Sequence, residues 1–113
     1  MTKIKFFKNK DVYTGFECSG HTGYAEFGKD ILCASISSMT QSVVLGVIKV
    51  LKISAKVTRN DDKGYIKLEM PENLKNDLIS KSQILFETLK VGVEDLLEGY
   101  DKYIKMEVIE NVY

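Results

Sequence analysis

A cysteine and the chain's single histidine lie twelve residues apart, at Cys33 and His21. A thiol becomes a strong nucleophile when an imidazole accepts its proton and a positive electrostatic potential holds the thiolate. The segment between them contains glycines, so the chain can fold back and bring the imidazole within hydrogen-bond reach of the sulfur. The two residues therefore predict a cysteine hydrolase, with Cys33 as the nucleophile and His21 as its base.

Cys33 also lies where an apolar pattern typical of a helix begins, and Asp30 is the candidate N-cap. A cap at Asp30 would place Cys33 in the first turn, where unpaired backbone N–H groups and the helix dipole stabilise an anion. The same N–H groups are candidates for an oxyanion hole. Asp30 is also a candidate catalytic residue that orients His21, but the capping role competes for the same oxygens. We therefore rank Asp30 below the Cys33 and His21 pair.

Four further residues are candidate supporting or substrate-binding groups. Ser37 follows the cysteine by one helical turn and can hydrogen-bond to a substrate. Gly20 begins the glycine-rich segment 20–29 and would let it move, so a bulky residue there is expected to reduce activity and leave the fold intact. Tyr24 and Phe27 would cover apolar substrate residues when this segment closes.

Simpler interpretations exist for each of these side chains. A cysteine in an apolar helix is usually a small buried hydrophobe, although a position at the helix start favours reactivity. Cys18 alternates in step with Phe16, which predicts a packed core thiol on a strand. Cys18, His21, Asp30 and Cys33 can be grouped as four metal ligands, but no Cys-x-x-Cys pair supports such a site. We expect neither a metal nor a cofactor.

The periodicity of apolar residues predicts the elements that must position this site. Alternation predicts strands, and apolar residues spaced by three and four predict helices. Proline before the second helical pattern and glycine after it mark its two ends. The expected elements are strands at 2–7 and 12–18, a helix at 31–52, strands at 54–59 and 64–70, a helix that follows Pro71 and ends at Gly99, and a strand at 103–109.

This β-β-α-β-β-α-β order predicts an α+β fold, with a mostly antiparallel sheet packed against two helices. A chain of 113 residues, 44% of them hydrophobic, suffices for one core, so we expect a single domain over residues 1–113.

Composition argues against two classes of partner. The 16 basic and 16 acidic side chains cancel, which disfavours binding to nucleic acid. Lys, Asp or Ser interrupts the apolar runs, so we expect no membrane span, and residues 1–10 do not resemble a signal peptide.

The two cysteines of the chain do not form a disulfide framework. A cytoplasmic protein with reduced thiols is expected.

The motif around the two reactive residues closely resembles the signature of the ribosomal-processing cysteine proteases called Prp. It consists of Gly-His at 20–21, a glycine-rich connection, Asp-x-x-Cys-Ala at 30–34 and Ser37. The order of elements and the chain length also fit this family, so the resemblance spans the whole chain.

The resemblance implies a homodimeric bacterial endopeptidase that removes a short N-terminal extension from a large-subunit ribosomal protein, cutting after a pair of phenylalanines. Cys33 matches the family's nucleophile and His21 matches its base. Asp30 and Ser37 match a family aspartate and serine, and Gly20 matches a family glycine. A non-catalytic module that binds a ribosomal protein or an assembly intermediate is the alternative, and a small zinc-stabilised domain is the third candidate.

Overall fold

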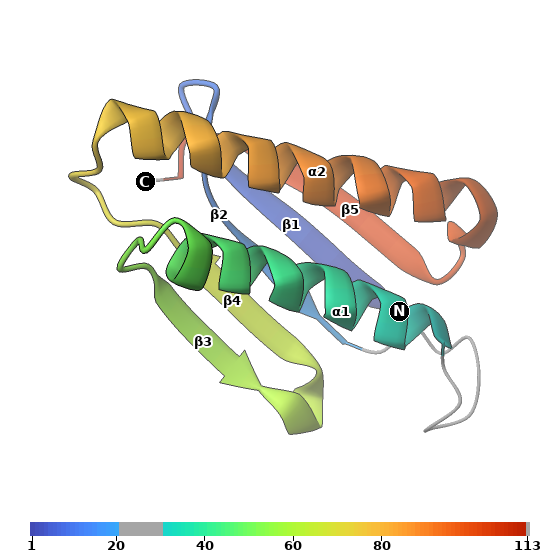
Figure 1. Cartoon of the computed structure of the whole chain (residues 1–113). Coiled ribbons are helices and arrows are strands. Elements are labelled where there is room, and N and C mark those ends of the chain that lie inside the picture. Colours follow the sequence, from blue (N-terminus) through green and yellow to red (C-terminus); the bar gives the residue numbers. More distant parts are fainter. Residues whose placement is uncertain (21–30, 113) are drawn as a thin grey trace.

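Five strands form one sheet, and both helices lie on the same face of it (Figure 1). The computed structural model describes residues 1–20 and 31–112. In chain order the elements are β1 (Thr2–Asn9), β2 (Val12–Ser19), α1 (Ile31–Leu45), the π-helical segment η1 (Gly46–Val50), β3 (Lys56–Asn60), the 3-10 helix η2 (Asp61–Lys63), β4 (Tyr65–Glu69), α2 (Asn76–Tyr100) and β5 (Ile104–Ile109).

The strands lie in the order β3-β4-β2-β1-β5. The β1–β5 pair is parallel, and the other three neighbouring pairs are antiparallel. The predicted α+β fold with a mostly antiparallel sheet and two packed helices is therefore confirmed. Every predicted strand is present, with ends shifted by up to two residues.

The core lies between the helices and the sheet face that they cover. Phe6 of β1 and Phe16 of β2 are cross-strand partners, and both are fully buried. Phe86 of α2 packs on this pair, with its ring centroid 6.2 Å from that of Phe16. Burying each such ring contributes about 1.5–3 kcal/mol, so this cluster fixes α2 on the sheet. Cys18 is also buried, at 6% exposure, as its alternation with Phe16 predicts.

Helix α1 ends differently from the prediction. Its α-helical part stops at Leu45, and the π-helical segment η1 continues the coil to Val50. Gly46 lies at this change, where an added Cβ would be 3.0 Å from Leu85 Cδ1 of α2. The close approach of the two helices therefore favours glycine at this position. The chain then turns at Lys52, which has a positive φ of 55°.

The prediction that Gly99 is the C′ residue that follows the end of α2 is wrong. The helix continues through Tyr100, and Asp101 is its C-cap, with φ of −60° and ψ of −20°. A Cβ added at Gly99 would meet nothing within 4 Å. Gly99 is thus an ordinary helical residue and not the left-handed residue that ends many helices.

Residues Ile31–Val50 are long and apolar enough to cross a membrane by length and composition, with a mean hydropathy of 1.8 over the best window. The predicted serine interruptions are present in this segment, but serine lowers hydropathy less than a charged residue does, so the absence of a membrane span stays a prediction. The core helix of a globular protein passes the same test. In this structure one face of the segment packs in the hydrophobic core, through Leu32, Ile36, Val43 and Val47.

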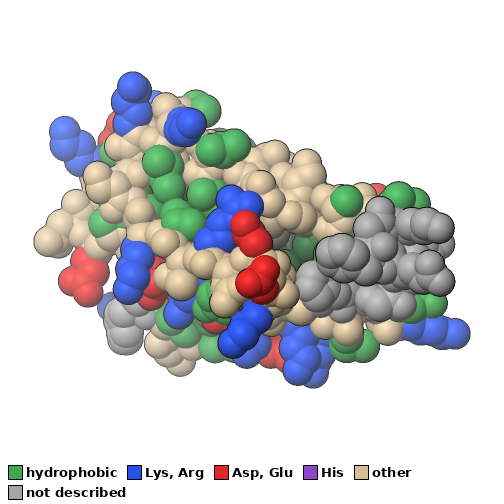
Figure 2. All heavy atoms as spheres, turned by 90° about the horizontal axis from the view of Figure 1, so that it is seen from below, with side chains coloured by type: hydrophobic (Ala, Val, Ile, Leu, Met, Phe, Trp, Pro, Cys, Tyr) green, Lys and Arg blue, Asp and Glu red, His purple; other side chains and the backbone are tan. Residues whose placement is uncertain are grey.

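Charged side chains of both signs are interspersed over the surface in Figure 2. On β5, Lys105 and Glu107 form an ion pair, with 3.1 Å between Nζ and Oε1. This distribution agrees with the zero formal net charge of the sequence.

Candidate active site

Cys33 is the third residue of α1, so the predicted position in the first helical turn is confirmed. Its side chain is half-buried. Backbone N–H groups of a first turn have no partner within the helix, and they point toward any negative charge placed at that end. Residues 31–34 include no acidic side chain that would oppose a thiolate.

A cleft of about 240 Å³ lies beside Cys33, between α1 and the hairpin formed by β3 and β4. Cys33, Ser37 and Gln41 are spaced by four residues, so they follow one face of α1 and line the cleft together. Gln41 Nε2 donates a hydrogen bond of 2.7 Å to Ser37 Oγ. The structure therefore brings Ser37 to the same cleft as the candidate nucleophile, as the sequence predicts.

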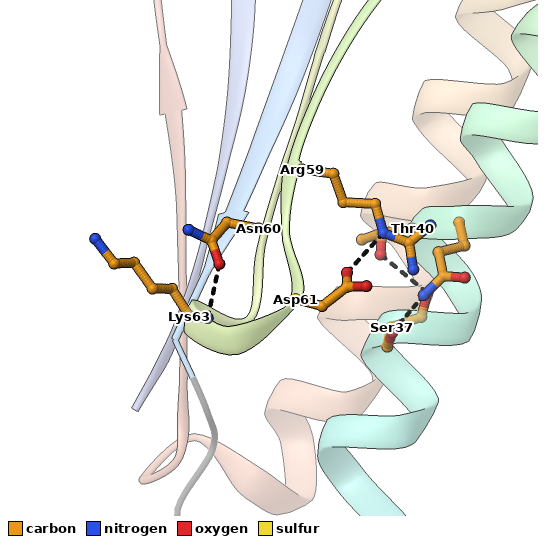
Figure 3. Close-up of polar contacts among 7 residues, drawn as sticks. Ser37, Thr40, Arg59, Asn60, Asp61 and Lys63 are labelled. Atoms are coloured by element: carbon orange, nitrogen blue, oxygen red, sulfur yellow. Dashed lines mark hydrogen bonds and ion pairs between the residues drawn. The ribbon is translucent and has the colours of Figure 1, made fainter.

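The opposite wall of the cleft comes from the β3–β4 hairpin. Arg59 Nε donates a hydrogen bond of 2.8 Å to Asp61 Oδ1. Figure 3 shows both side chains on the side of the hairpin that faces Ser37 and Thr40 of α1. The turn itself is held by a hydrogen bond of 3.3 Å from the Lys63 backbone N–H to Asn60 Oδ1. Because the Arg59 and Asp61 pair is exposed, it contributes at most about 1 kcal/mol to stability.

The floor of the cleft is mostly apolar, with Thr2 and Thr40 as its buried polar residues. Cys18 of β2 and Ile66 of β4 are cross-strand partners, and both line the cleft. Burial, together with smaller effects of the nearby Cys33 and Glu17, raises the pKa of the Cys18 thiol to about 12. Cys18 therefore stays protonated at neutral pH and is a poor nucleophile, which leaves Cys33 as the candidate.

Gly20 also lines the cleft, but its role differs from the prediction. Its φ is +88°, and an added Cβ would lie 2.6 Å from the backbone oxygen of Met1. Any side chain at this position would strain the backbone and displace the start of β1. The expectation that a bulky residue here leaves the fold intact is therefore wrong.

Four of the candidate residues, namely His21, Tyr24, Phe27 and Asp30, lie outside the described residues. The base, the helix cap and the covering aromatic residues thus stay predictions from the sequence. Two members of the grouping of four metal ligands, His21 and Asp30, also lie there. Within residues 1–20 and 31–112, no group of three or more His, Cys, Asp or Glu side chains could hold a metal ion.

A second hollow of about 570 Å³ is larger than the cleft beside Cys33. It lies at the start of α2 and is lined by residues that include Tyr13, Met70, Leu74 and Gln83. Neither cysteine contributes to it. We therefore assign the candidate active site to the smaller cleft. Of these two cavities, only the smaller one has the candidate nucleophile among its described residues.

Sequence reasoning did not identify several polar residues of the cleft, among them Gln41, Arg59 and Asp61. Gln41 lies eight residues after Cys33, so helical spacing alone would have placed it on the same face. Arg59 and Asp61 carry no comparable signal, because they reach the cleft only through the pairing of β3 with β4 and the packing of α1.

Comparison with known proteins connects this geometry to a family. The sequence model of the cysteine protease Prp family matches residues 1–105. The ribosomal processing cysteine protease Prp of Bacillus subtilis (strain 168) is 30% identical over 91 residues, which cover 80% of this chain and 81% of that protein. Its counterpart in Staphylococcus aureus (strain Mu50 / ATCC 700699) is 24% identical over 87 residues, or 77% of this chain and 78% of that protein.

Solved structures show the same fold. A Streptococcus mutans protein superposes with a TM-score of 0.83 at 25% identity, covering 98% of this chain and 96% of that one. The essential ribosomal processing protease Prp of Staphylococcus aureus, in complex with a covalently linked product peptide, has a TM-score of 0.83 at 20% identity, covering 96% of this chain and 99% of that one. With the family match over residues 1–105 and Cys33 at a helix start beside a cleft, the chain belongs to the cysteine protease Prp family.

Proposed function

We propose that this chain is a cysteine endopeptidase that removes an N-terminal extension from a large-subunit ribosomal protein. Membership of the Prp family supports cleavage of a peptide bond by a cysteine. The relatives in Bacillus subtilis and Staphylococcus aureus are ribosomal processing proteases, which supports a ribosomal protein as the substrate.

The observation that carries the proposal is the position of Cys33, in the first turn of α1 and on the wall of a cleft. A peptide bound in that cleft would present its scissile carbonyl carbon to the sulfur. Attack by the thiolate forms a C–S bond and moves the carbonyl electron pair onto oxygen. The first-turn N–H groups of α1 are the candidate donors for this oxyanion.

The remaining steps need a proton carrier. His21 takes the thiol proton before attack and returns it to the leaving amine when the C–N bond breaks, which leaves a thioester on Cys33. Water then attacks the thioester with the same base and restores the thiol. Asp30 orients His21 or caps α1, and either role supports the pair without replacing it.

The decisive experiment uses a peptide that contains two adjacent phenylalanines followed by a short tail. The protein is incubated with this peptide, and the products are identified by mass spectrometry. The wild-type protein should cut after the pair, whereas Cys33→Ala and His21→Ala should lose at least about a thousandfold in rate, as losses of members of such catalytic sets do.

Ser38→Ala is the matched control, because Ser38 lies on α1 close to Cys33 but is exposed and does not line the cleft. Its rate should equal that of the wild type. If the wild-type protein binds the peptide and never cuts it, the proposal fails, and the chain acts as a non-catalytic binding module.

We also propose that the protein works in the cytoplasm as a homodimer, with neither nucleic acid nor membrane as a direct partner. The homodimer follows from the family resemblance. Ile84 and Val91, two turns apart on α2, are 67% and 59% exposed and offer an apolar surface for contact with a second copy. Sedimentation equilibrium should give twice the mass of 12.8 kDa. A single-chain mass at micromolar concentration would contradict the dimer.

A further inference from the structure

The cleft beside Cys33 combines a mostly apolar floor with a polar rim. Its buried floor combines the apolar side chains of Cys18, Ile36 and Ile66, from β2, α1 and β4, with the side chains of Thr2 and Thr40. Ser37 and Gln41 line one side of the rim, and Arg59 and Asp61 line the other. Such a cleft suits a peptide whose backbone meets the polar rim while one apolar side chain enters the floor.

The floor lies close to the nucleophile. Ile36 follows Cys33 by three residues on α1, so the two side chains are neighbours on the helix surface. Cys18 faces the helices from the sheet and lies near enough to Cys33 for the charge of one thiol to affect the other. A substrate residue whose carbonyl meets the Cys33 sulfur would therefore have its own side chain within reach of this floor.

Cys18 has a smaller side chain than the other apolar floor residues, Ile36 and Ile66, and it pairs directly with Ile66 across the β2–β4 ladder. The cleft has a volume of about 240 Å³, large enough for a side chain to enter in place of several water molecules. A larger residue at position 18 would occupy part of this volume, while its backbone would keep the same strand pairing.

We propose that Cys18 is a specificity-determining residue: it sets the depth of the pocket that receives the apolar side chain of the substrate residue immediately before the scissile bond. This inference rests on the proposed protease function. A shallow floor would admit only small side chains, whereas the cysteine leaves room for a large apolar or aromatic one. The reaction itself does not involve the Cys18 thiol.

The test compares two peptides that differ only in the residue before the scissile bond, phenylalanine in one and alanine in the other. The ratio of their kcat/KM values is measured for the wild type and for Cys18→Leu. Changes of a methylene or more in an apolar pocket alter such ratios by roughly 10- to 200-fold. Cys18→Leu should therefore shift the ratio toward alanine by at least about tenfold.

Val44→Leu is the matched control, because Val44 is a buried core residue of α1 that does not line the cleft. It should leave the ratio at the wild-type value. Thermal unfolding shows whether Cys18→Leu folds. If it does not, Cys18→Val replaces it in the test, because valine adds less volume than leucine. Cys18→Val should shift the ratio in the same direction by a smaller factor than Cys18→Leu.

The outcomes separate this inference from the proposed function. If the wild type cuts neither peptide, the protease function fails. If the wild type cuts both and the folded Cys18→Leu or Cys18→Val variant keeps the wild-type ratio, the specificity role of Cys18 is overturned while the protease function stands. An equal loss on both peptides also overturns it, because a depth-setting residue must discriminate between them.

Discussion

Cys33 and Cys18 line one cleft from the two layers of the fold: Cys33 lies on helix α1 and Cys18 lies on strand β2 of the sheet. Their environments differ: Cys33 is half-buried at a helix start, whereas Cys18 is buried on the sheet. The two thiols of this chain therefore differ in reactivity for reasons that the structure makes visible.

The first prediction concerns alkylation of the two thiols. In the folded protein at pH 8, iodoacetamide should modify Cys33 much faster than Cys18, because burial raises the pKa of Cys18 to about 12 and leaves almost none of it as thiolate. Peptide mapping by mass spectrometry at timed intervals measures both rates. In denaturant the rates should become similar, and equal rates in the folded protein would contradict the assigned environments.

The second prediction is a loss of stability at alkaline pH. The unfolded chain releases the Cys18 proton near pH 9.0, whereas the folded chain keeps it until about pH 12. The folded state therefore binds more protons in this window, and the free energy of unfolding should fall by up to about 1.4 kcal/mol per pH unit from this group. Its stabilising contribution is fully present below pH 9.0.

Urea denaturation of the reduced protein at pH 8 and pH 10 measures this effect. Cys18→Ala should show a shallower decline than the wild type, because the tyrosines and lysines that also titrate are common to both proteins. The same decline in both would show that the Cys18 thiol is not protected from ionisation in the fold.

The third prediction distinguishes two glycines. Gly20→Ala should lower the free energy of unfolding by about 1–3 kcal/mol, because φ is +88° and the new Cβ would approach the Met1 oxygen to 2.6 Å. Gly99→Ala should raise it by about 0.5–1 kcal/mol, since Gly99 lies in α2 with open space around it. Chemical denaturation measures both, and effects of the same sign would argue against the strained conformation at Gly20.

The fourth prediction concerns the chain's own N-terminus, where Phe6 and Phe7 form a pair that resembles the family's target. Both residues lie in β1, which is hydrogen-bonded to β2 on one side and to β5 on the other. A protease needs an accessible extended backbone, so the folded protein should keep its full mass during prolonged incubation. Appearance of a chain beginning at Lys8 would contradict this prediction.

Much of the fold could be predicted from the sequence, because local patterns of apolar residues indicate where most of the strands and helices lie. Alternation in residues 2–7 and 12–18 matches β1 and β2, since one face of each strand packs on the helices. The ends of the helices were less predictable. The π-helical segment begins at Gly46, which lies close to Leu85 of α2, and this close approach is a tertiary contact that no local pattern encodes.

The site could be predicted only along its own helix. Cys33 and Ser37 follow from helical spacing and are confirmed as neighbours on one cleft. Arg59 and Asp61 were not predictable, because strand pairing and helix packing together bring the hairpin to α1. The position of Cys18 at the cleft floor was missed for the same reason. Alternation along the strand indicates that the thiol is buried, but it does not indicate that a cleft lies above it.

The most direct test of the central claim is to trap the acyl-enzyme. The protein is mixed with the peptide carrying two phenylalanines, quenched in acid within seconds and analysed by mass spectrometry. The account predicts a protein mass increased by that of the N-terminal product less one water, with the added group mapped to Cys33 and absent from Cys33→Ala. A product formed at the wild-type rate by Cys33→Ala, or an acyl group mapped to Cys18, would contradict the assignment of Cys33 as the nucleophile.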